Sequence, residues 1–315
     1  MNFKYRLPFK SYCILFSVFS PAVAFSKPKI VTTTTDLAWM AQQIAGPDAQ
    51  VESLLNGSED PHFVDARPDY IRKVSSADAV CIVGLDLEVG WMPKVLAKSG
   101  REQLQPGGKG FCETGNRIEV LEKPTGPVDR SMGDVHPSGN PHFWLSPTAL
   151  AQASEEVKET LARIDPSHAE SYRTRATEFK KQMKELEDAG RERFKKAGVV
   201  GESARFFEYH REFSYFAKSF GLESLGSIEE KPGISPSAGR IASVASKAKA
   251  NKIKFVLATS HASKRTLSRF EDLSGSKVLS VAVSISKHGE IQDYPALLAS
   301  IQDAVIKAVT GDTKK

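Results

Sequence analysis

Three histidines of this chain occupy positions from which they could bind a metal ion together. His62 lies in the tetrapeptide DPHF and His142 in the similar NPHF, each directly after a proline that restricts the local backbone, and His210 ends the run ARFFEYH. Neutral imidazoles bind Zn²⁺ at about 2.0–2.1 Å, and a carboxylate or a water often takes the fourth position. If the fold brings them together, these three side chains predict a zinc site.

Each histidine also has an ordinary structural explanation. Alone, His62 and His142 could be hydrogen-bonded loop residues, and His210 could cap a helix. The histidines expected to be solvated or in turns are His136, His168 and His288. Of these, His136 lies in a Gly- and Ser-rich loop and could still capture a metal transiently. His261 follows a predicted strand and could reach a shared site.

The segments around these residues alternate between two kinds of periodicity. Apolar or β-branched runs predict strands at 29–34, 49–55, 78–84, 117–122, 204–210, 222–228, 253–259 and 276–284. Helical spacing predicts helices at 36–44 (with Asp36 as cap), 67–77, 89–100, 146–165, 211–221, 235–251, 263–275 and 294–309. Strands separated by helices are typical of parallel βα units, so the chain is predicted to be α/β with mainly parallel sheets.

The longest helical segment runs from Ser167, its predicted N-cap, to about Ala197. About thirty helical residues span about 45 Å, which is more than one small domain needs. We therefore predict an N-terminal α/β lobe at 25–164, a long linker helix at 165–198 and a C-terminal α/β lobe at 199–315. The histidines would then meet in the cleft between the lobes, where strand ends bind ligands.

Residues 1–24 are predicted to be a signal peptide. They have a basic start, a short apolar stretch at 12–21 and the small residues Ala22–Ala24 before the cleavage site. Cys13 begins the apolar stretch rather than ending it, so no lipid anchor is expected. Cleavage takes away three positive charges and lowers the formal net charge from +5 to +2. The mature chain is therefore expected in the periplasm, as a monomer without nucleic-acid partners or a direct membrane anchor.

Two cysteines remain in the predicted mature chain, Cys81 and Cys112. In an oxidising compartment they could form a disulfide, but their spacing does not decide between that and two buried thiols.

The motifs taken together resemble the zinc- and manganese-binding solute-binding proteins of bacterial ABC importers. The resemblance rests on DPHF followed by ARPDY, on NPHFW entering a helix, on the long helix, and on YHREFSYF after it. It implies two lobes joined by a rigid helix, one metal ion in the cleft and a membrane permease as partner, with no enzymatic role. By this resemblance His62, His142 and His210 are the metal ligands.

The chain also departs from the pattern of that family. Asn140 replaces the usual Asp before the proline of NPHF, and Ala282 holds the position of an acidic ligand. The loss of a carboxylate favours Zn²⁺ over Mn²⁺, with Mn²⁺ kept as the alternative. His261 and Glu59 are the candidates for the fourth ligand. The loop at 123–140, which holds His136, is shorter than the His-rich loop of zinc-type members, so a metal-collecting role is reduced.

Two other classes of protein fit parts of this pattern. Three histidines and a water would satisfy an exported zinc-dependent hydrolase, although the chain has no HExxH motif and offers only Glu59 or Glu208 as a general base. A two-lobe binder of an organic solute would use the histidines as cleft residues. Turnover of ester, peptide or phosphate substrates would favour the hydrolase, and absence of metal from the purified protein would favour the organic-solute binder.

Overall fold

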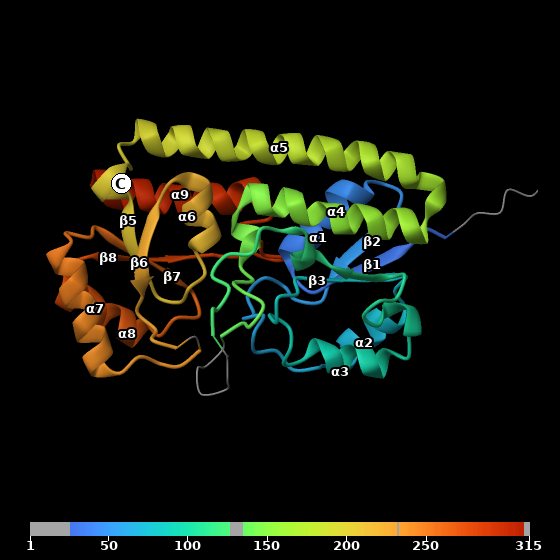
Figure 1. Cartoon of the computed structure of the whole chain (residues 1–315), viewed down its shortest axis with the longest axis horizontal. Helices are drawn as coiled ribbons and strands as arrows, with labels where there is room; N and C mark the ends of the chain where they lie inside the picture. The colour runs from blue at the N-terminus through green and yellow to red at the C-terminus, as the bar shows by residue number, and fades with distance from the viewer. Residues whose placement is uncertain (1–25, 127–134, 232, 312–315) are drawn as a thin grey trace, which may run out of the picture.

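The computed structural model describes residues 26–126, 135–231 and 233–311. The predicted signal peptide at 1–24 lies outside these residues, as does part of the loop at 123–140. Two α/β lobes lie next to each other, and one long helix spans both of them (Figure 1). Within the described ranges, no helix combines the length and apolar character needed to cross a membrane.

The first lobe is built on a four-stranded parallel sheet of order β2-β1-β3-β4. Its strands are β1 (Lys29–Thr32), β2 (Gln50–Ser53), β3 (Ala79–Ile82) and β4 (Phe111–Glu113), and its helices are α1 (Thr35–Ala45), α2 (Pro68–Ser75), α3 (Met92–Ser99) and α4 (Pro147–Ile164). Neighbouring strand residues face opposite layers: Ile30 packs in the cluster that includes α1 and α4, and Val31 in the cluster that includes α2 and α3. Burial on both faces explains the apolar strand sequences.

The second lobe repeats this arrangement with the strand order β6-β5-β7-β8, again all parallel. Its strands are β5 (Arg205–Glu208), β6 (Glu223–Ser227), β7 (Phe255–Thr259) and β8 (Lys277–Val281), and its helices are α6 (Ser214–Phe220), α7 (Ala238–Ala250), α8 (Lys264–Ser274) and α9 (Tyr294–Thr310). The prediction of two α/β lobes with parallel sheets is confirmed.

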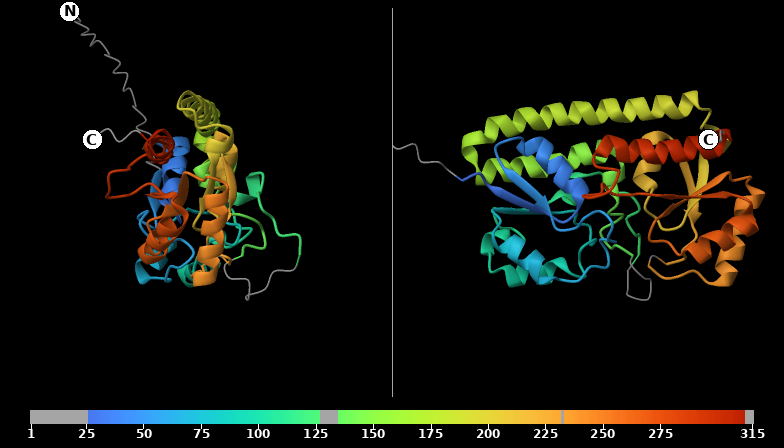
Figure 2. Two further views of the ribbon diagram at one scale, coloured as in Figure 1. Left: turned by 90° about the vertical axis from the view of Figure 1, so that its left-hand side faces the viewer. Right: turned by 180° about the vertical axis from the view of Figure 1, so that it is seen from behind.

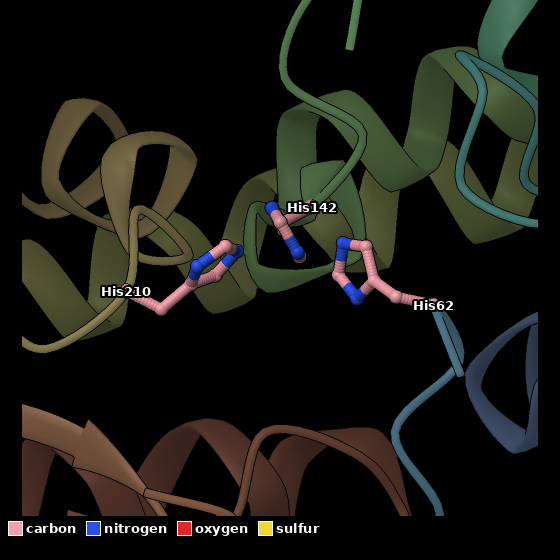
Figure 3. A group of neighbouring side chains, drawn as sticks. All are labelled: His62, His142 and His210. Carbon is pink, nitrogen blue, oxygen red and sulfur yellow. The ribbon is translucent and has the colours of Figure 1, made fainter. Parts of the chain in front are cut away.

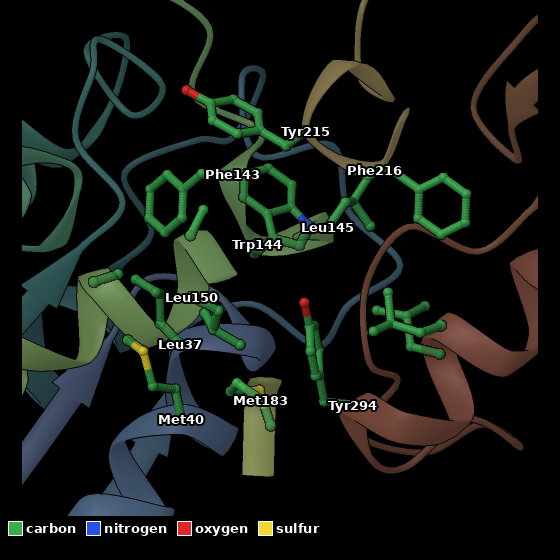
Figure 4. Close-up of a cluster of buried hydrophobic side chains, with 14 of the residues drawn as sticks. Leu37, Met40, Phe143, Trp144, Leu145, Leu150, Met183, Tyr215, Phe216 and Tyr294 are labelled. Atoms are coloured by element: carbon green, nitrogen blue, oxygen red, sulfur yellow. The ribbon is translucent and has the colours of Figure 1, made fainter. Parts of the chain in front are cut away.

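Helix α5 (Ala169–Lys196) is the long helix, with 28 residues. Its buried side chains pack against α1 and α4 in one lobe and against α6 and α9 in the other. Figure 4 shows the shared core around Trp144, with Tyr215 of α6 on one side of the indole and Met183 of α5 and Tyr294 of α9 on the other. A core common to both lobes holds them in a fixed relation to the helix.

A segment of the second lobe crosses to the first directly after β8 (Figure 2). The indole Nε1 of Trp144 donates to the Val283 carbonyl at 2.7 Å, and the Thr35 hydroxyl donates to the Ile285 carbonyl at 2.6 Å. The Ile285 amide donates to Asp36 Oδ1 at 3.1 Å. These bonds fasten the end of the second sheet to the first lobe.

Three local predictions were wrong. The segment 117–122 is not a strand, because its backbone binds side chains instead: Leu121 N donates to the Tyr215 hydroxyl and Glu119 N to Gln152 Oε1. The strand at that edge is β4, in a stretch where no strand was predicted. Helix α1 is capped by Thr34, whose side chain accepts from Leu37 N, while Asp36 is buried at the lobe contact. Helix α5 begins two residues after Ser167, whose hydroxyl binds Asp165.

The two cysteines lie opposite each other on β3 and β4 and are both buried. In the described structure both are free thiols, and burial raises the pKa of Cys112 well above its usual value.

Gly190 of α5 lies directly against helices α6 and α9 of the second lobe. A Cβ at this position would overlap the Phe220 ring and the Gln302 amide. In Gly190→Ala, the helix-propensity gain of about 0.5–1 kcal/mol is therefore outweighed by overpacking of about 1–3 kcal/mol. We predict a lower free energy of unfolding for this variant in urea.

The matched control is Gly239→Ala in α7, where a Cβ would contact only Ser237 Oγ at 3.9 Å. This variant should be neutral or up to about 1 kcal/mol more stable. Equal effects of the two substitutions would contradict the close packing of α5 on the second lobe.

Candidate metal centre

The structure brings together His62, His142 and His210, which the sequence predicted. One nitrogen of each ring lies within 4.8 Å of one nitrogen of both others. Figure 3 shows His62 and His142 coming from the first lobe and His210 from the second, with their rings turned toward one another. The ring centroids are 5.2 to 5.5 Å apart. We call these three residues the histidine triad.

Each ring of the triad is oriented by an oxygen that faces its Nδ1 atom. The three contacts are His62 with Asp60 Oδ1 at 2.8 Å, His142 with Asn140 Oδ1 at 2.9 Å, and His210 with Glu229 Oε2 at 2.9 Å. A carboxylate or amide oxygen can only accept, so Nδ1 carries a proton in each ring and Nε2 is the nitrogen that is left for a further partner. This is the arrangement by which protein oxygens orient metal-binding histidines.

The similar tetrapeptides DPHF and NPHF form the same local structure. Asp60 Oδ1 accepts from the His62 amide at 3.0 Å as well as from its ring, and Asn140 Oδ1 does the same for His142 at 2.9 Å. The Asx residue therefore fixes both the backbone and the ring of the histidine two positions later, and the intervening proline suits such a turn. Their shared pattern, Asx-Pro-His, therefore fixes the orientation of the imidazole ring.

His142 is the most buried member of the triad, with 1% of its surface exposed. Its Nε2 atom has no hydrogen-bond partner among the described residues. A buried polar atom left in this state costs about 1–3 kcal/mol, so the site is built for a group that the protein itself does not supply there. A bound cation at the centre of the triad meets that need.

The protonation of these histidines differs with their surroundings. Burial lowers the pKa of His142 well below its usual value and that of His136 to about 3, and the neighbouring imidazoles add to both effects. Burial acts on His210 in the same direction, but the hydrogen bond to Glu229 and the charge of Glu212 outweigh it and raise its pKa to about 9. A metal ion that bound the Nε2 of His210 would therefore have to displace a proton from this ring.

Asn140 is required by its neighbours, which explains the departure at this position. Its Nδ2 donates to Glu122 Oε2 at 2.8 Å and to the Arg211 carbonyl at 3.0 Å. An aspartate here would place a second oxygen against these two acceptors. The negative charge is retained nearby on Glu122, which also pairs with the Arg211 guanidinium at 2.7 Å.

His136 was expected to be solvated, and this prediction was wrong. Its Nε2 lies 3.1 Å from the Nε2 of His62, and its ring lies edge-on to that of His142 with centroids 6.2 Å apart. The sequence analysis had noted only that His136, in the loop before NPHF, could capture a metal transiently.

The other candidates are placed differently. Both carboxylate oxygens of Glu59 accept from Asn56, one from its amide N–H and one from its side chain, each at 2.8 Å. His261 is exposed and lines a cavity of about 250 Å³ together with His62 and His210. Neither residue joins the group of nitrogens described above.

One buried carboxyl group in the same cavity was missed by the sequence analysis. Glu212 follows His210 by two residues, and its Oε2 has no hydrogen-bond partner within the part of the chain that is described. Burial raises the pKa of Glu212 to about 8. Ala282 follows β8 and packs against the shared core, so it provides no ligand.

Comparison with known proteins identifies the family. The model of the ZnuA family, described as zinc-uptake complex component A, periplasmic, matches residues 30–308. The chain belongs to this family.

Two curated relatives of this ZnuA-family protein are named for binding different metals. The zinc-binding lipoprotein AdcA of Streptococcus pneumoniae R6 is 27% identical over 264 residues, 82% of this chain and 51% of AdcA. The chain thus spans about half the length of that relative. The iron-binding protein YfeA of Yersinia pestis is 27% identical over 296 residues, 91% of this chain and 88% of YfeA. A crystal structure of ZnuA has the same fold, with a TM-score of 0.73, 21% identity and coverage of 90% of this chain and 100% of that one.

Substitution of Asn140 tests the hydrogen bonds that aim His142. Asn140→Asp should lower the free energy of unfolding of the metal-free protein in urea by about 1–3 kcal/mol, because a buried acceptor then faces Glu122 and the Arg211 carbonyl. The double variant Asn140→Asp/Glu122→Gln should recover part of this loss. An unchanged or higher stability for Asn140→Asp alone would contradict the assigned bonding.

Proposed function

We propose that this protein captures one Zn²⁺ ion in the periplasm and delivers it to the membrane permease of an ABC importer. The observation that carries the proposal is the histidine triad, whose rings have their Nδ1 atoms held by oxygens, with the Nε2 of His142 buried and unpartnered in the described structure. Family membership supports the transport role. We also propose that the mature chain acts as a monomer without a lipid anchor.

The donor set favours Zn²⁺ over Mn²⁺. Imidazole nitrogens suit zinc, whereas Mn²⁺ and Mg²⁺ prefer carboxylate, carbonyl and water oxygens. Ala282 removes the carboxylate that the sequence comparison with this family led us to expect, and the acidic side chains Asp60 and Glu229 hydrogen-bond to the imidazoles. Binding of Mn²⁺ remains the alternative within the same family.

Capture would tie the lobes together, since two ligands belong to the first lobe and one to the second. Helix α5 and the bonds of the crossing segment, such as Trp144 Nε1 to Val283, restrict wide opening. We infer that the ion enters and leaves through small displacements of the loops that carry the ligands. A permease that moved His210 away from His62 and His142 would leave the ion with two protein ligands and release it.

A hydrolytic role has less support from the site. Glu208, one of the two carboxylates considered as a general base, is buried and accepts from Ser224 Oγ and from Phe213 N at 2.9 Å. Glu59 is held by Asn56. Both groups are thus engaged away from the position where a metal-bound water would lie, so we propose a binding protein and not an enzyme.

Zinc titration by calorimetry tests the proposed function. The mature protein should bind one Zn²⁺ per chain, and His62→Ala/His142→Ala should weaken binding by more than about 100-fold, because loss of two ligands exceeds the 10–100-fold effect of losing a supporting residue. The control is His168→Ala/His288→Ala, which removes two histidines outside the triad and should leave affinity unchanged. Wild-type stoichiometry and affinity in the triad variant would refute the proposal.

A further inference from the structure

We propose that His136 is the fourth zinc ligand and that the turn at Gly84–Asp86 holds it in place. The inference rests on the proposed function, since it adds a ligand to the histidine triad. It assigns the fourth ligand position to a residue of the loop that precedes NPHF. This residue would replace the acidic ligand whose position in this chain is held by Ala282.

The first argument is the distance between His136 and His62. Their Nε2 atoms are 3.1 Å apart. Two nitrogens bound to one tetrahedral Zn²⁺ lie about 3.3 Å apart, so the observed pair already has about the spacing of two ligands of one ion. His136 is not in the group of nitrogens that all lie within 4.8 Å of one another, so binding the ion of the triad requires its ring to move closer to the other two histidines. Because the Nδ1 proton of His62 points to Asp60, the Nε2 of His62 presents a lone pair toward His136. A cation between the two nitrogens satisfies both rings as acceptors.

The second argument is that the segment holding His136 is anchored to the first lobe. Ser138 N donates to Asp86 Oδ2 at 3.0 Å, and the His136 ring is hydrogen-bonded to the Asp86 backbone. Gly139 N donates to the His136 carbonyl at 3.1 Å, which closes a turn over these residues. The ring is therefore oriented by a backbone contact, as the triad rings are by side-chain oxygens.

The turn that supplies this anchor has an unusual backbone. Leu85 and Asp86 have φ of 53° and 66°, directly after Gly84 at 80°. Left-handed conformations are unfavourable for non-glycine residues, and they persist only where the surrounding structure fixes them. The turn lies directly after β3 and carries Asp86 to the side of the His136 segment.

Glu88 fixes the turn from inside the lobe. Its carboxylate is buried and accepts from Val83 N at 2.8 Å, from Gly84 N at 3.0 Å and from the Thr33 hydroxyl at 2.6 Å. The strain at Leu85 and Asp86 is thus maintained by a dedicated set of hydrogen bonds. Placing Asp86 where it can hold the segment of His136 would account for this strain.

Glu212 is the competing donor for the fourth position. Its Oε2 is buried and unpartnered in the described structure, and it lines the cavity beside His62 and His210. However, no contact at hydrogen-bond distance joins its carboxylate to a triad nitrogen in the described ranges, whereas His136 already touches His62. The geometry therefore favours the histidine.

The test measures zinc affinity of the mature protein by competition with a chelator. His136→Gly should still bind one Zn²⁺, but at least about tenfold more weakly, and added free imidazole should restore part of the affinity by filling the vacated position. His288→Gly, a histidine outside the site, is the matched control and should bind like the wild type. Glu212→Gln should bind within about threefold of the wild type.

Two further readouts separate a ligand from a structural residue. With Co²⁺ in place of Zn²⁺, the visible absorption of His136→Gly should differ from that of the wild type, because one nitrogen leaves the coordination shell. In Asp86→Ala, a positioning variant, zinc affinity should fall while the spectrum at saturating Co²⁺ stays that of the wild type.

The inference is overturned if His136→Gly binds zinc like the wild type. It is equally overturned if Glu212→Gln loses affinity and changes the Co²⁺ spectrum while His136→Gly does neither, which would assign the position to the carboxylate. Both outcomes leave zinc capture by the triad intact. Failure of the wild-type protein to bind zinc would instead refute the proposed function.

Discussion

The site depends on the hydrogen bonds that hold the Nδ1 atoms of the triad. Asp60, Asn140 and Glu229 each present an oxygen to one ring, and each bond leaves the Nε2 atom of that ring without this kind of partner. Without these contacts the imidazoles could rotate or exchange tautomers, and the three nitrogens would not form a group ready for one ion. The metal affinity of such a site depends on this pre-orientation of the rings as much as on the ligands themselves.

The fold supplies the frame in which these bonds can act across two lobes. Helix α5 packs on both lobes, and the segment after β8 is bonded to Trp144, Thr35 and Asp36 of the first lobe. His210 is thereby kept opposite His62 and His142. If an ion binds there as proposed, little conformational entropy is lost in ordering its ligands.

The sequence was sufficient for the parts that follow local rules. Strand and helix periodicity gave both lobes, and the positions of His62 and His210 after strands predicted that they would converge. Segment 117–122 was mistaken for a strand because its backbone partners, Tyr215 and Gln152, are distant in sequence. His136 was missed for the same kind of reason, since its position depends on a left-handed turn fixed by a buried carboxylate about fifty residues earlier.

The interpretation of Asn140 shows a further limit. The sequence showed the loss of a charge, but the effect depends on Glu122 and the Arg211 carbonyl, which only the fold brings to Asn140. The amide of Asn140 keeps the acceptor for His142 and adds a donor for Glu122 and the Arg211 carbonyl.

The central claim, that one zinc ion is held by imidazoles from both lobes, is tested most directly by X-ray absorption at the zinc edge. For the mature protein loaded with one Zn²⁺, the account predicts nearest neighbours at about 2.0–2.1 Å with the outer-shell scattering of at least three imidazole rings. Scattering from fewer than three rings, or sulfur neighbours at about 2.3 Å, would contradict it.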